Sequence, residues 1–392
     1  MDLTVFSNDK YSRKDFEFLG SIASTPYGHI ERTRNIKDNK EYALKVFEKF
    51  HLLDQEAYNK TVKEKHLLVS FKNTQPFLPL HCTFSDSENV YFVLELCPHG
   101  NLMQFMQRFT KFPFELARFY AGELVYMLET LRSEGIVHSE INPANLVIGP
   151  DYHIHLTNFQ NAYSMTERIN RRISLVESPD YLSPEALEGE TTVAAEVWAA
   201  GCLIYHMLVG KSPFHASTIP MTYDKIRNGQ IDFPSILPPF AVDLIQSMLL
   251  SDPTIRLGVN NFGDLKSHIF FQGLEIDTIY TFPVPDYKHE MSKDIRKNHR
   301  IIMEGVVKKK AGWIYKRRLV VISEEPRISY FEPTRRELRG EIAISPDLRG
   351  EVKNKIDFHI ITPKRTYYFK VINEDPHKWV KAVAELVHKI YG

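Results

Sequence analysis

Polar residues that could do chemistry occur in six short motifs along the first two thirds of this 392-residue chain. In order, the motifs are Tyr42-Ala43-Leu44-Lys45, a single Glu64, His138-Ser139-Glu140-Ile141-Asn142-Pro143-Ala144-Asn145, Thr157-Asn158-Phe159, Ser183-Pro184-Glu185, and Asp252-Pro253 with Arg256. Their ammonium, carboxylate and amide groups are types that bind anions, accept hydrogen bonds and hold cations. Each motif alone is common, so its meaning depends on the order of the motifs and on the elements that carry them.

The elements expected around these motifs form a small β-rich lobe followed by a larger helical lobe. Runs of β-branched and aromatic residues predict the strands, and apolar residues at helical spacing predict the helices. The predicted strands are at 41–47, 89–96 and 153–159, and the predicted helices are at 54–71, 114–132 and within 191–271. Lys45 then lies on a strand, Glu64 on a helix and Glu140 in a loop. The fold class is α+β.

Motif order, spacing and element type together resemble the AGC group of protein kinases from about residue 12 to residue 275. Within that group the chain is most similar to the phosphoinositide-dependent kinases, in which a pleckstrin-homology (PH) domain follows the kinase domain. The resemblance implies a bilobal protein-kinase fold followed by a small β-barrel or sandwich PH domain with a C-terminal helix. The expected limits are 1–275 for the kinase-like domain, with lobes at about 12–97 and 98–275, then 276–299 for a linker and 300–392 for the PH domain.

The resemblance assigns roles to the motif residues, because kinases catalyse phosphoryl transfer by placing charges around the transferred phosphate. Lys45 and Glu64 match the ion pair that holds the α- and β-phosphates of ATP, and Asn145 matches one of two positions that hold Mg²⁺. The second of these positions is an aspartate in the family and is Asn158 here. A hard dication prefers a carboxylate to a neutral amide, so we expect Mg²⁺ not to bind tightly.

Three further positions depart from the family pattern. Glu140 replaces the aspartate that orients the substrate hydroxyl, and its extra methylene moves the carboxylate by about 1 Å, which can cost roughly 10²-fold in rate. Asn142 replaces the lysine that neutralises the transferring phosphate. In the glycine-rich loop, Ala23 and Thr25 replace two glycines, and the following Pro26 removes a backbone donor.

These losses predict an inactive Ser/Thr protein kinase, or pseudokinase, that acts as a scaffold or allosteric regulator in signalling. By resemblance, the positions that hold the fold are kept, namely His138 and Phe159 in the internal hydrophobic column and the buried ion pair of Glu185 with Arg256. The alternative is a weakly active kinase that uses Glu140 as its base and phosphorylates AGC-kinase activation loops with ATP. Motif loss alone does not decide function, so the sequence does not decide between an inactive and a weakly active kinase.

Nucleotide binding is a separate question from catalysis. By resemblance, Ile22, Ala43, Leu146 and the hinge segment from Glu95 to Cys97 keep an apolar slot for adenine, so that ATP could bind weakly through Lys45. The same residues would also serve as ordinary core. The sequence does not separate these two interpretations.

One regulatory position also follows from the resemblance. Ser174 aligns with the activating phosphorylation serine of the family. The arginine that normally holds its phosphate is replaced by Ser139, although Arg171 and Arg172 lie nearby in the sequence. Loss of that partner favours an ordinary loop serine.

The C-terminal quarter of the chain differs from the rest in charge and in pattern. Residues 300–392 carry 20 Lys+Arg and 12 Asp+Glu, against 29 and 37 in the remainder of a chain whose net charge is zero. A basic domain on an acidic body indicates an anionic partner for that domain. Strands are predicted at 317–323, 327–331, 341–344, 356–361 and 366–371, before a helix that begins at Pro376 and carries Trp379 on its apolar stripe.

The segment Gly305–Arg318 reads GVVKKKAGWIYKRR, which predicts two strands whose adjoining ends are basic. This pattern resembles the inositol-phosphate site of a PH domain. Carried over by position, the lipid-contacting residues are Lys309, Lys316, Arg318, Arg339 and Arg365. Near an anionic leaflet each basic residue is worth about 1 kcal/mol, which favours phosphoinositide lipids as the partner. A PH fold that binds protein instead of lipid is the alternative.

Several other classes are disfavoured by the sequence. No stretch reaches the roughly 18 apolar residues of a membrane span, and the N-terminus lacks a signal-peptide pattern. The three cysteines, Cys82, Cys97 and Cys202, cannot all pair and show no metal-ligand spacing, so we expect free buried thiols in a reducing compartment. We therefore expect a cytoplasmic protein that is reversibly recruited to membranes.

Nucleic-acid binding is disfavoured because we interpret Tyr367, Tyr368 and Phe369 as strand core and not as exposed aromatic residues between basic ones. The partners that we expect are phosphoinositide lipids, together with AGC-type kinases or other signalling proteins.

Overall fold

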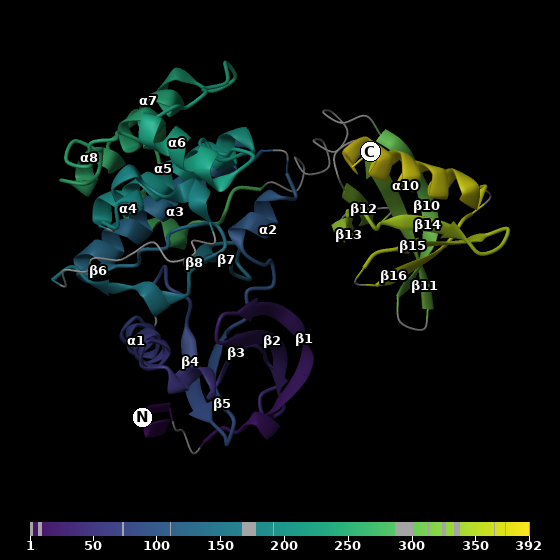
Figure 1. Ribbon diagram of the computed structural model, residues 1–392, viewed down its shortest axis with the longest axis horizontal. Helices are drawn as coiled ribbons and strands as arrows, with labels where there is room; N and C mark the ends of the chain where they lie inside the picture. The colour runs from purple at the N-terminus through teal and green to yellow at the C-terminus, as the bar shows by residue number, and fades with distance from the viewer. Residues whose placement is uncertain are drawn as a thin grey trace. The chain divides into compact units, whose positions relative to one another are not determined.

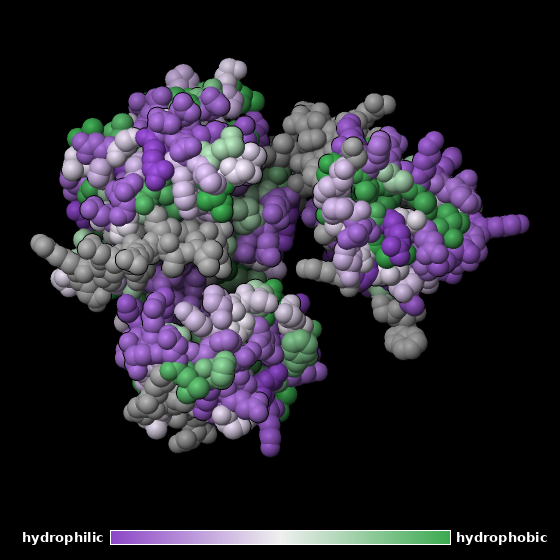
Figure 2. Space-filling model, viewed as in Figure 1, coloured by the Kyte–Doolittle hydropathy of each residue, from purple (hydrophilic) through white to green (hydrophobic). Residues whose placement is uncertain are grey.

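In the computed structural model the chain divides into two compact units, Met1–Tyr287 and Lys288–Gly392, and each is described by itself. The structure describes residues 3–6, 10–72, 74–109, 111–166, 178–190, 192–286, 301–311, 314–323, 327–332, 338–363, 365–372 and 374–391. The first unit has a sheet lobe and a helical lobe, and the second is a sheet with one helix packed on it (Figure 1). Hydrophobic side chains reach the visible surface of both units as separate patches among hydrophilic ones (Figure 2).

The small lobe is an antiparallel sheet in the order β1-β2-β3-β5-β4. Its strands are β1 Phe16–Thr25, β2 Gly28–Asn35, β3 Glu41–Glu48, β4 Leu80–Ser85 and β5 Asn89–Glu95. Helix α1, Gln55–Ser70, begins after Asp54, whose carboxylate accepts a hydrogen bond from the Ala57 amide at 2.9 Å. That bond is an N-cap, and it explains why the helix begins there. The short helices are η1 Leu3–Phe6, η2 Arg13–Asp15 and η3 His51–Leu53.

The large lobe is mainly helical. Its helices are α2 Leu102–Met106, α3 Phe114–Ser133, α4 Pro184–Leu187, α5 Val193–Val209, α6 Ile219–Asn228, α7 Pro239–Met248 and α8 Phe262–Lys266. Two short strand pairs join β6 Ile136–Val137 to β9 Tyr163–Ser164 and β7 Leu146–Ile148 to β8 Ile154–Leu156. The polar loop 138–145 lies between β6 and β7, so both pairs fix its ends. Within the part of the chain that the structure describes, no helix has both the length and the apolar character needed to cross a membrane.

The strand that we predicted at 153–159 is shorter in the structure, and this expectation was wrong in its second half. Strand β8 ends at Leu156, and Asn158 has a left-handed backbone with φ 68° and ψ 61°. A strand cannot continue through that conformation, which asparagine adopts more readily than most residues. The 3₁₀ helix η4, Phe159–Asn161, follows at once.

Residues 276–281 form the 3₁₀ helix η7, Ile276–Thr281, in the segment that we expected to be linker. Ile276 and Ile279 are buried, and a Cβ added to Gly122 of α3 would lie 2.6 Å from the Ile279 side chain. This helix therefore packs closely on α3 as part of the first unit. Two further 3₁₀ helices of the large lobe are η5 Pro179–Tyr181 and η6 Ile269–Phe271.

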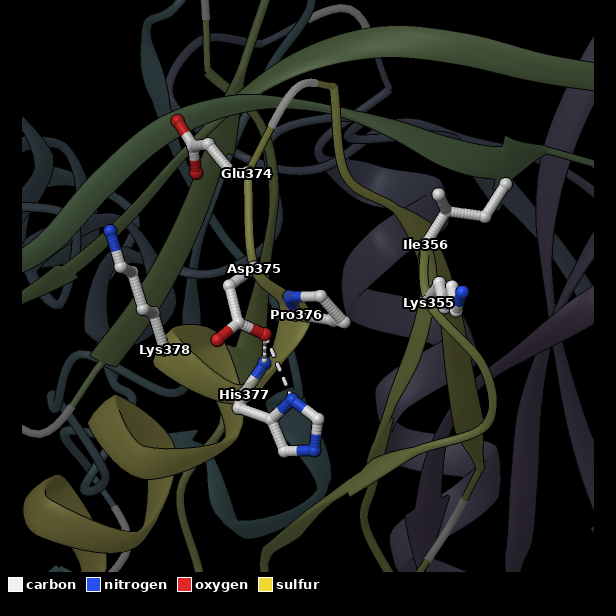
Figure 3. Close-up of a pocket in the computed structure, with 7 residues that line it drawn as sticks. All are labelled: Lys355, Ile356, Glu374, Asp375, Pro376, His377 and Lys378. Carbon is white, nitrogen blue, oxygen red and sulfur yellow. Dashed lines mark hydrogen bonds and ion pairs between the residues drawn. The ribbon is translucent and has the colours of Figure 1, made fainter.

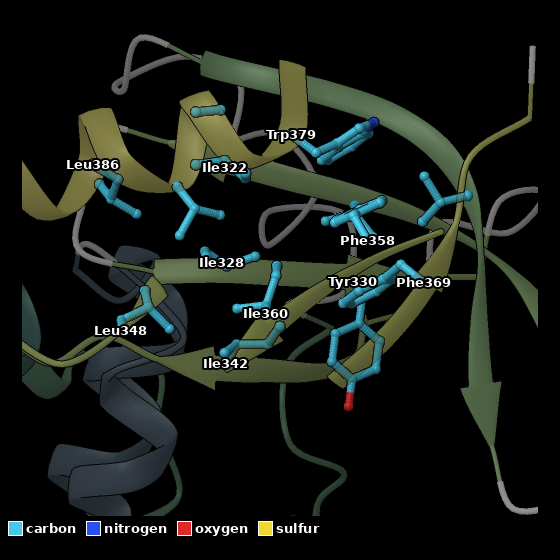
Figure 4. Close-up of a cluster of buried hydrophobic side chains, with 14 of the residues drawn as sticks. Ile322, Ile328, Tyr330, Ile342, Leu348, Phe358, Ile360, Phe369, Trp379 and Leu386 are labelled. Carbon is cyan, nitrogen blue, oxygen red and sulfur yellow. The ribbon is translucent and has the colours of Figure 1, made fainter. Parts of the chain in front are cut away.

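The second unit contains an antiparallel sheet in the order β13-β12-β11-β10-β16-β15-β14. Its elements are β10 Ile301–Ala311, β11 Ile314–Ser323, β12 Arg327–Phe331, β13 Leu338–Ala343, β14 Arg349–Val352, β15 Asp357–Ile361, β16 Thr366–Lys370 and α10 Pro376–Tyr391. Trp379 of α10 is fully buried, and its ring stacks on Phe358, which stacks on Phe369, at centroid distances of 5.5 and 5.1 Å (Figure 4). The predicted role of Trp379 as a core residue is confirmed. Strand β14 was not predicted.

Candidate nucleotide cleft and basic surface site

Lys45 on β3 and Glu64 on α1 form a buried ion pair. The Lys45 Nζ lies 2.8 Å from each carboxylate oxygen of Glu64, and the two residues are 4% and 0% exposed. Lys45 is fixed in mid-sheet because its strand pairs with Ile30 of β2 on one side and Phe92 of β5 on the other. The structure thus brings together the two residues expected to hold the phosphates of a nucleotide.

A chain of hydrogen bonds continues from this pair through two asparagines. The Lys45 Nζ lies 3.5 Å from Oδ1 of Asn158, and Asn158 Nδ2 donates to Oδ1 of Asn145 at 3.2 Å. Asn145 Nδ2 donates in turn to the backbone carbonyl of Glu140 at 2.9 Å. The two residues expected at the metal positions therefore meet, and they bond to each other. Two neutral amides make a poor donor set for Mg²⁺, which is usually held by carboxylates.

The carboxylate of Glu140 is held by a residue that the sequence analysis did not single out. Asn161, the last residue of η4, donates from Nδ2 to Oε1 of Glu140 at 2.6 Å. Its backbone carbonyl also accepts a hydrogen bond from Ser139 Oγ at 2.7 Å. Glu140 is thus tied to the segment that carries Asn158.

Asn142, at the position of the family lysine, bonds within the polar loop itself. Its Oδ1 accepts from the backbone amides of Ala144 at 2.9 Å and Asn145 at 3.2 Å, and its Nδ2 donates to the Glu140 carbonyl at 3.2 Å. Asparagine commonly bonds to nearby backbone groups in this way. The side chain therefore shapes the loop and supplies no positive charge.

A buried carboxylate on α5 supports the start of the same loop. Glu196 Oε1 accepts hydrogen bonds from the backbone amides of His138 at 2.6 Å and Ser139 at 3.0 Å. Burial raises the pKa of Glu196 to about 7, although both hydrogen bonds act in the opposite direction. Ser139 has a left-handed backbone with φ 67°, so the two amides point to one acceptor at a sharp turn.

An aromatic column joins helix α1 to the polar loop. Phe159 packs edge-on against His138 at a centroid distance of 5.0 Å, and it contacts Phe71 and Phe77 at 5.4 and 5.6 Å. His138 Nε2 lies 3.0 Å from the carbonyl oxygen of Thr157. These rings are buried. They fix Phe159, which directly follows Asn158, whose Oδ1 lies 3.5 Å from the Lys45 Nζ.

The predicted ion pair of Glu185 and Arg256 is present in the large lobe. Both guanidinium nitrogens of Arg256 bond to the carboxylate, at 2.7 and 3.1 Å, and the arginine is 1% exposed. Arg256 also donates to the carbonyls of Ala194 and Leu250 and lies over the Trp198 ring at 5.1 Å. A guanidinium with this many partners can be buried without a large desolvation penalty.

The β1–β2 hairpin turns at Pro26 and Tyr27, between Thr25 and Gly28, which face each other across β1 and β2. Gly28 has φ +155°, and a Cβ there would lie 2.1 Å from the carbonyl oxygen of Val46. Only glycine allows this approach. Gly28 is thus required for close packing on β3.

The expected adenine-contacting residues differ in exposure. Ile22 of β1 is 46% exposed, whereas Ala43 of β3 is 9% exposed and Leu146 of β7 is fully buried. Glu95 ends β5, and Cys97, two residues later, is partly buried. Burial raises the pKa of Cys97 to about 12, so its thiol stays protonated. Ile22 is therefore not a core residue, while Ala43 and Leu146 are.

In the second unit, three of the five predicted lipid-contacting residues lie close together around Tyr330. The Lys309 Nζ lies 4.4 Å from the Tyr330 ring centroid. Burial raises the pKa of Tyr330, and the charge of Arg365 opposes that rise. Burial and the neighbouring charges of Arg365 and Arg318 lower the pKa of Lys309. The charges of Arg365 and Arg318 therefore act on Lys309. Figure 4 shows the Tyr330 hydroxyl pointing away from the apolar cluster.

The other two predicted residues flank this group. Lys316 is exposed and faces Lys309 across β10 and β11. Arg339 is exposed on β13 beside Gly340, which is the partner of Tyr330 in the sheet. A second tyrosine completes the site, because the Tyr367 ring lies 4.0 Å from the Arg365 guanidinium and 5.5 Å from the Lys309 Nζ. We call Lys309, Lys316, Arg318, Arg339, Arg365 and the two tyrosines the basic site.

A separate cavity of about 620 Å³ lies where the β14–β15 loop meets the start of α10 (Figure 3). It is lined by Lys355, Ile356, Glu374, Asp375, Pro376, His377 and Lys378. Asp375 accepts hydrogen bonds from the backbone amide and Nδ1 of His377 at 2.9 and 2.8 Å. None of the predicted site residues lines this cavity.

The argument against nucleic-acid binding was wrong in one respect. Successive residues of a strand point to opposite faces, so Tyr367, Tyr368 and Phe369 cannot all be core. Phe369 is buried, but Tyr368 is 41% exposed, and its ring lies 5.2 Å from the Lys310 Nζ. An exposed aromatic residue between basic ones is thus present.

Comparison with known proteins identifies the family. A family model described as "Protein kinase domain" matches residues 16–271. The chain belongs to the protein kinase family. A second model, described as "PH domain", matches residues 289–392 of this kinase. Together with the two-lobed first unit and the sheet-and-helix second unit, these matches confirm the predicted fold class.

Curated relatives place this kinase within the family. It is 26% identical to "3-phosphoinositide-dependent protein kinase 1" of Homo sapiens over 96% of this chain and 84% of the relative. It is 30% identical to "Putative 3-phosphoinositide-dependent protein kinase 2" of Homo sapiens, over 72% and 73%. It is 31% identical to "cAMP-dependent protein kinase, catalytic subunit-like" of Caenorhabditis briggsae, over 69% and 70%. This is an AGC-type kinase related to 3-phosphoinositide-dependent protein kinase 1, as the motifs indicated.

Two groups of site residues in this kinase were missed from the sequence. Asn161 belongs to none of the six motifs. Its position three residues after Asn158 was the one indication in the sequence that it lies near the polar loop. Tyr330 and Tyr367 lie on predicted strands, where aromatic residues are usually core, and only the register shows that they flank the basic residues. The predicted regulatory Ser174 lies outside the described residues.

Proposed function

We propose that this kinase is a catalytically inactive member of its family that phosphoinositides recruit to membranes through the PH domain. The observation that carries the inactive assignment is the hydrogen bond between Asn158 and Asn145, 3.2 Å long, at the two positions expected to hold the metal. Each amide serves as the partner of the other. Neither carries the negative charge that would attract Mg²⁺.

The other side chains around the transfer position support the same conclusion. Asn142 is bonded to its own loop and supplies no cation, and Glu140 is held by Asn161. Kinase catalysis depends on charges placed around the γ-phosphate, so these losses compound. Lys45 is intact in its pair with Glu64, which leaves a weak binding contact for the phosphates of ATP.

The groups that hold the fold are complete, in contrast to the groups that would perform the reaction. Arg256 makes four hydrogen bonds to three residues, and Phe159 packs against both Phe71 and His138. A folded but inactive kinase domain suits a scaffold or an allosteric regulator. We propose AGC-type kinases or other signalling proteins as its partners, and a cytoplasmic location with reversible recruitment to membranes.

A second function is favoured by one specific observation, the intact Lys45–Glu64 pair beside a carboxylate at residue 140. In this alternative the protein is a slow Ser/Thr kinase that uses Glu140 as its base and phosphorylates AGC-kinase activation loops. The substrate would need to displace the Asn161 amide from Glu140.

Transfer of labelled γ-phosphate, to the protein itself and to an activation-loop peptide, separates these two functions. The assay is run with Mg²⁺ and with Mn²⁺, beside Lys45→Met protein shown by circular dichroism to be folded. We expect wild-type signal no higher than that of the variant. Signal that disappears in the variant would establish the slow kinase instead.

Membrane recruitment is tested by cosedimentation with vesicles. The basic site has five cationic residues, and the pKa of Lys309 is lowered first by burial and then by the charges of Arg365 and Arg318. We expect vesicles with phosphorylated inositides to retain the full chain better than plain phosphatidylcholine vesicles. An Arg318→Ala/Arg365→Ala variant that binds both kinds of vesicle equally would support the assignment. Equal binding of wild-type protein to both kinds of vesicle would contradict it.

A further inference from the structure

A buried pair of titratable side chains lies where α3 meets strand β8 and the 3₁₀ helix η7. Glu123 of α3 is fully buried, and its Oε1 is hydrogen-bonded to Nδ1 of His153, which is 5% exposed. The other carboxylate oxygen, Oε2, accepts a hydrogen bond from the backbone amide of Ile154 at 3.1 Å. The proposed function assigns this pair no role.

Tyr280 connects η7 to the buried pair. Its ring centroid lies 5.2 Å from that of His153 and 5.4 Å from that of Tyr126 on α3. Its hydroxyl donates a hydrogen bond to the backbone carbonyl of Ile154 at 2.8 Å. Ile154 is thus bonded to Glu123 through its amide and to Tyr280 through its carbonyl, so η7 and the pair share one stretch of backbone.

The pair binds protons more tightly in the folded protein than exposed side chains would. Burial raises the pKa of Glu123 to about 7, although its contacts with His153 act in the opposite direction. Burial lowers the pKa of His153, but the Glu123 and Asp151 carboxylates and the Phe282 backbone raise it by more, and the net shift is upward. Phe282 directly follows η7, so docking of this segment favours the protonated histidine. By linkage, protonation of the histidine favours docking.

The other titratable groups around the pair come from the same elements and the turn before β8, and they are Asp151, His155, Tyr120, Tyr126 and Tyr280. Asp151 is exposed and accepts a hydrogen bond from the His153 amide at 3.2 Å. Burial lowers the pKa of His155 to about 4, and its Nδ1 is buried without a hydrogen-bond partner among the described residues. His155 therefore weakens docking only as the pH falls below about 6.5, the ordinary pKa of histidine. Burial raises the pKa of Tyr280, which stays neutral.

Among the elements that contact the pair, η7 is the one most easily displaced. Helix α3 is 20 residues long and buried along most of its length, and β8 is paired with β7. In contrast, η7 has six residues, held by Ile276, Ile279 and Tyr280 and by an ion pair of Asp277 with Lys266 on α8 at 2.7 Å. Short segments with few buried side chains open locally at a lower cost than the core does.

We propose that the Glu123–His153 pair is a proton-dependent latch, which holds the segment 276–286 on α3 when protonated and releases it when deprotonated. An ionised Glu123 beside a neutral His153 is a buried charge without a countercharge, and displacement of η7 lets water reach it. The segment ends one residue before the limit of the first unit. Release adds its eleven residues, roughly 35–40 Å at full extension, to the chain that joins the two units. The latch therefore controls the length of that connection.

Hydrogen exchange of the full chain, measured by mass spectrometry at pH 6.5 and pH 8.5, tests the latch. Protection of peptides that cover 276–286 is corrected for the intrinsic pH dependence of exchange and compared with that of α5 peptides in the same sample. Above pH 6.5 the Glu123–His153 pair dominates, because His155 is then mostly neutral in both states. We expect the segment to lose about tenfold more protection than α5, the change that one released proton gives over one pH unit.

Two variants separate proton release from simple loosening of η7. Glu123→Gln keeps a side chain that can bond to His153 and the Ile154 amide but cannot ionise, and it removes the charge that keeps His153 protonated. Its segment should change less than about twofold over the same pH range. Asp277→Asn is the matched control, since it removes the exposed ion pair of η7 with Lys266. It should lower protection by the same factor at both pH values and keep the tenfold ratio.

Equal corrected protection of the wild-type segment at the two pH values overturns the inference, whether or not Glu123→Gln folds. A tenfold fall that persists in Glu123→Gln protein with α5 still protected also overturns it, because another group would then control the segment. A parallel loss of protection in wild-type α5 would mean that the whole kinase domain opens, which rules out a local latch.

Discussion

Asn161 donates its side-chain amide to the carboxylate of Glu140, with Nδ2 and Oε1 2.6 Å apart. The contact ties Glu140, which stands at the position of the family's catalytic aspartate, to the η4 segment. Its Oε1 therefore already accepts a hydrogen bond from a donor other than a substrate hydroxyl. Asn145 and Asn158 are bonded to each other in the same small region, at 3.2 Å. A single reversion therefore changes one residue of a network whose hydrogen bonds are already formed.

From this network we predict that activity returns only when several positions revert together. Glu140→Asp alone should give no phosphate transfer above the Lys45→Met background, because the metal position and the missing cation remain. The triple variant Glu140→Asp/Asn142→Lys/Asn158→Asp should exceed that background by at least about 10²-fold, the order of one restored electrostatic contact. A radiolabel assay on equal amounts of folded protein measures phosphate transfer by the single variant, the triple variant and Lys45→Met protein. Activity in the single variant would contradict the argument.

We also predict that Asn158→Asp makes nucleotide binding depend on Mg²⁺. The wild-type pair of amides offers no charge to the metal, so ATP should raise the melting temperature equally with Mg²⁺ and with EDTA. With a carboxylate at residue 158 the ATP-induced rise should be larger when Mg²⁺ is present. Asn161→Asp, which adds the same charge in η4, is the matched control. A wild-type response that already requires Mg²⁺ would show that the amides do hold the metal.

A third prediction concerns the buried pair and the control variant used in such assays. Lys45→Met leaves the carboxylate of Glu64, which is 0% exposed, without its partner, and should lower the free energy of unfolding by about 3–5 kcal/mol. Lys45→Met/Glu64→Leu removes both charges and should recover most of the loss. Urea unfolding of the three proteins measures both values. A double variant less stable than the single one would mean that the pair itself, and not the stranded charge, is what stabilises the fold.

Much of this arrangement follows from the sequence because kinase motifs fix elements that must meet. Lys45 on a strand and Glu64 on the next helix were expected to pair, and the apolar stripe of α10 pointed to Trp379 as core. The remainder depends on long-range register. Phe6, fully buried with its ring 6.0 Å from Phe92, comes from an N-terminal segment without periodicity, so nothing local revealed its burial.

The exposed face of Tyr368 follows from the sequence alone. Strand alternation alone requires that it face away from Tyr367 and Phe369, and the structure confirms that face as exposed. The contact of Tyr330 with Lys309 differs in kind, since Lys309 on β10 meets β12 only through the pairing of both strands with β11. No local pattern in the sequence predicts such a long-range register.

The raised pKa of Glu196 predicts a pH-dependent stability. Burial raises the pKa of Glu196 from 4.5 to about 7. At a pH between these two values, the unfolded chain therefore releases a proton that the folded protein keeps. Stability from this group is therefore full below about pH 4.5 and is lost as the pH rises through about 7, on the order of 3 kcal/mol in all. Glu196→Gln keeps an acceptor for the two backbone amides and should flatten this decline. Glu123, whose pKa burial also raises to about 7, leaves part of the slope in the variant.

Urea titrations at pH 5, 6, 7 and 8 measure that slope for wild-type and Glu196→Gln protein. Glu129→Gln, a surface change on α3, serves as the control and should follow wild type. Equal slopes in wild-type and Glu196→Gln protein would mean that Glu196 is ionised when folded, held so by its two backbone hydrogen bonds.

The last prediction concerns Gly340, which faces Tyr330 across β12 and β13. Its backbone has φ +150°, and a Cβ there would lie 2.3 Å from the Tyr330 hydroxyl oxygen. Gly340→Ala must therefore move the tyrosine, whose ring lies under the Lys309 ammonium. We expect phosphoinositide affinity to fall about tenfold, the order of one cation–π contact that positions a headgroup-binding lysine.

Binding of Gly340→Ala protein to phosphoinositide vesicles and to phosphatidylserine vesicles tests this directly. Gly20→Ala is the control, since a Cβ at Gly20 meets no atom within 4 Å. Loss confined to the phosphoinositide vesicles locates the effect in the basic site, to which Tyr330 belongs. An unchanged phosphoinositide affinity would show that Lys309 and Arg365 bind the headgroup without being positioned by Tyr330.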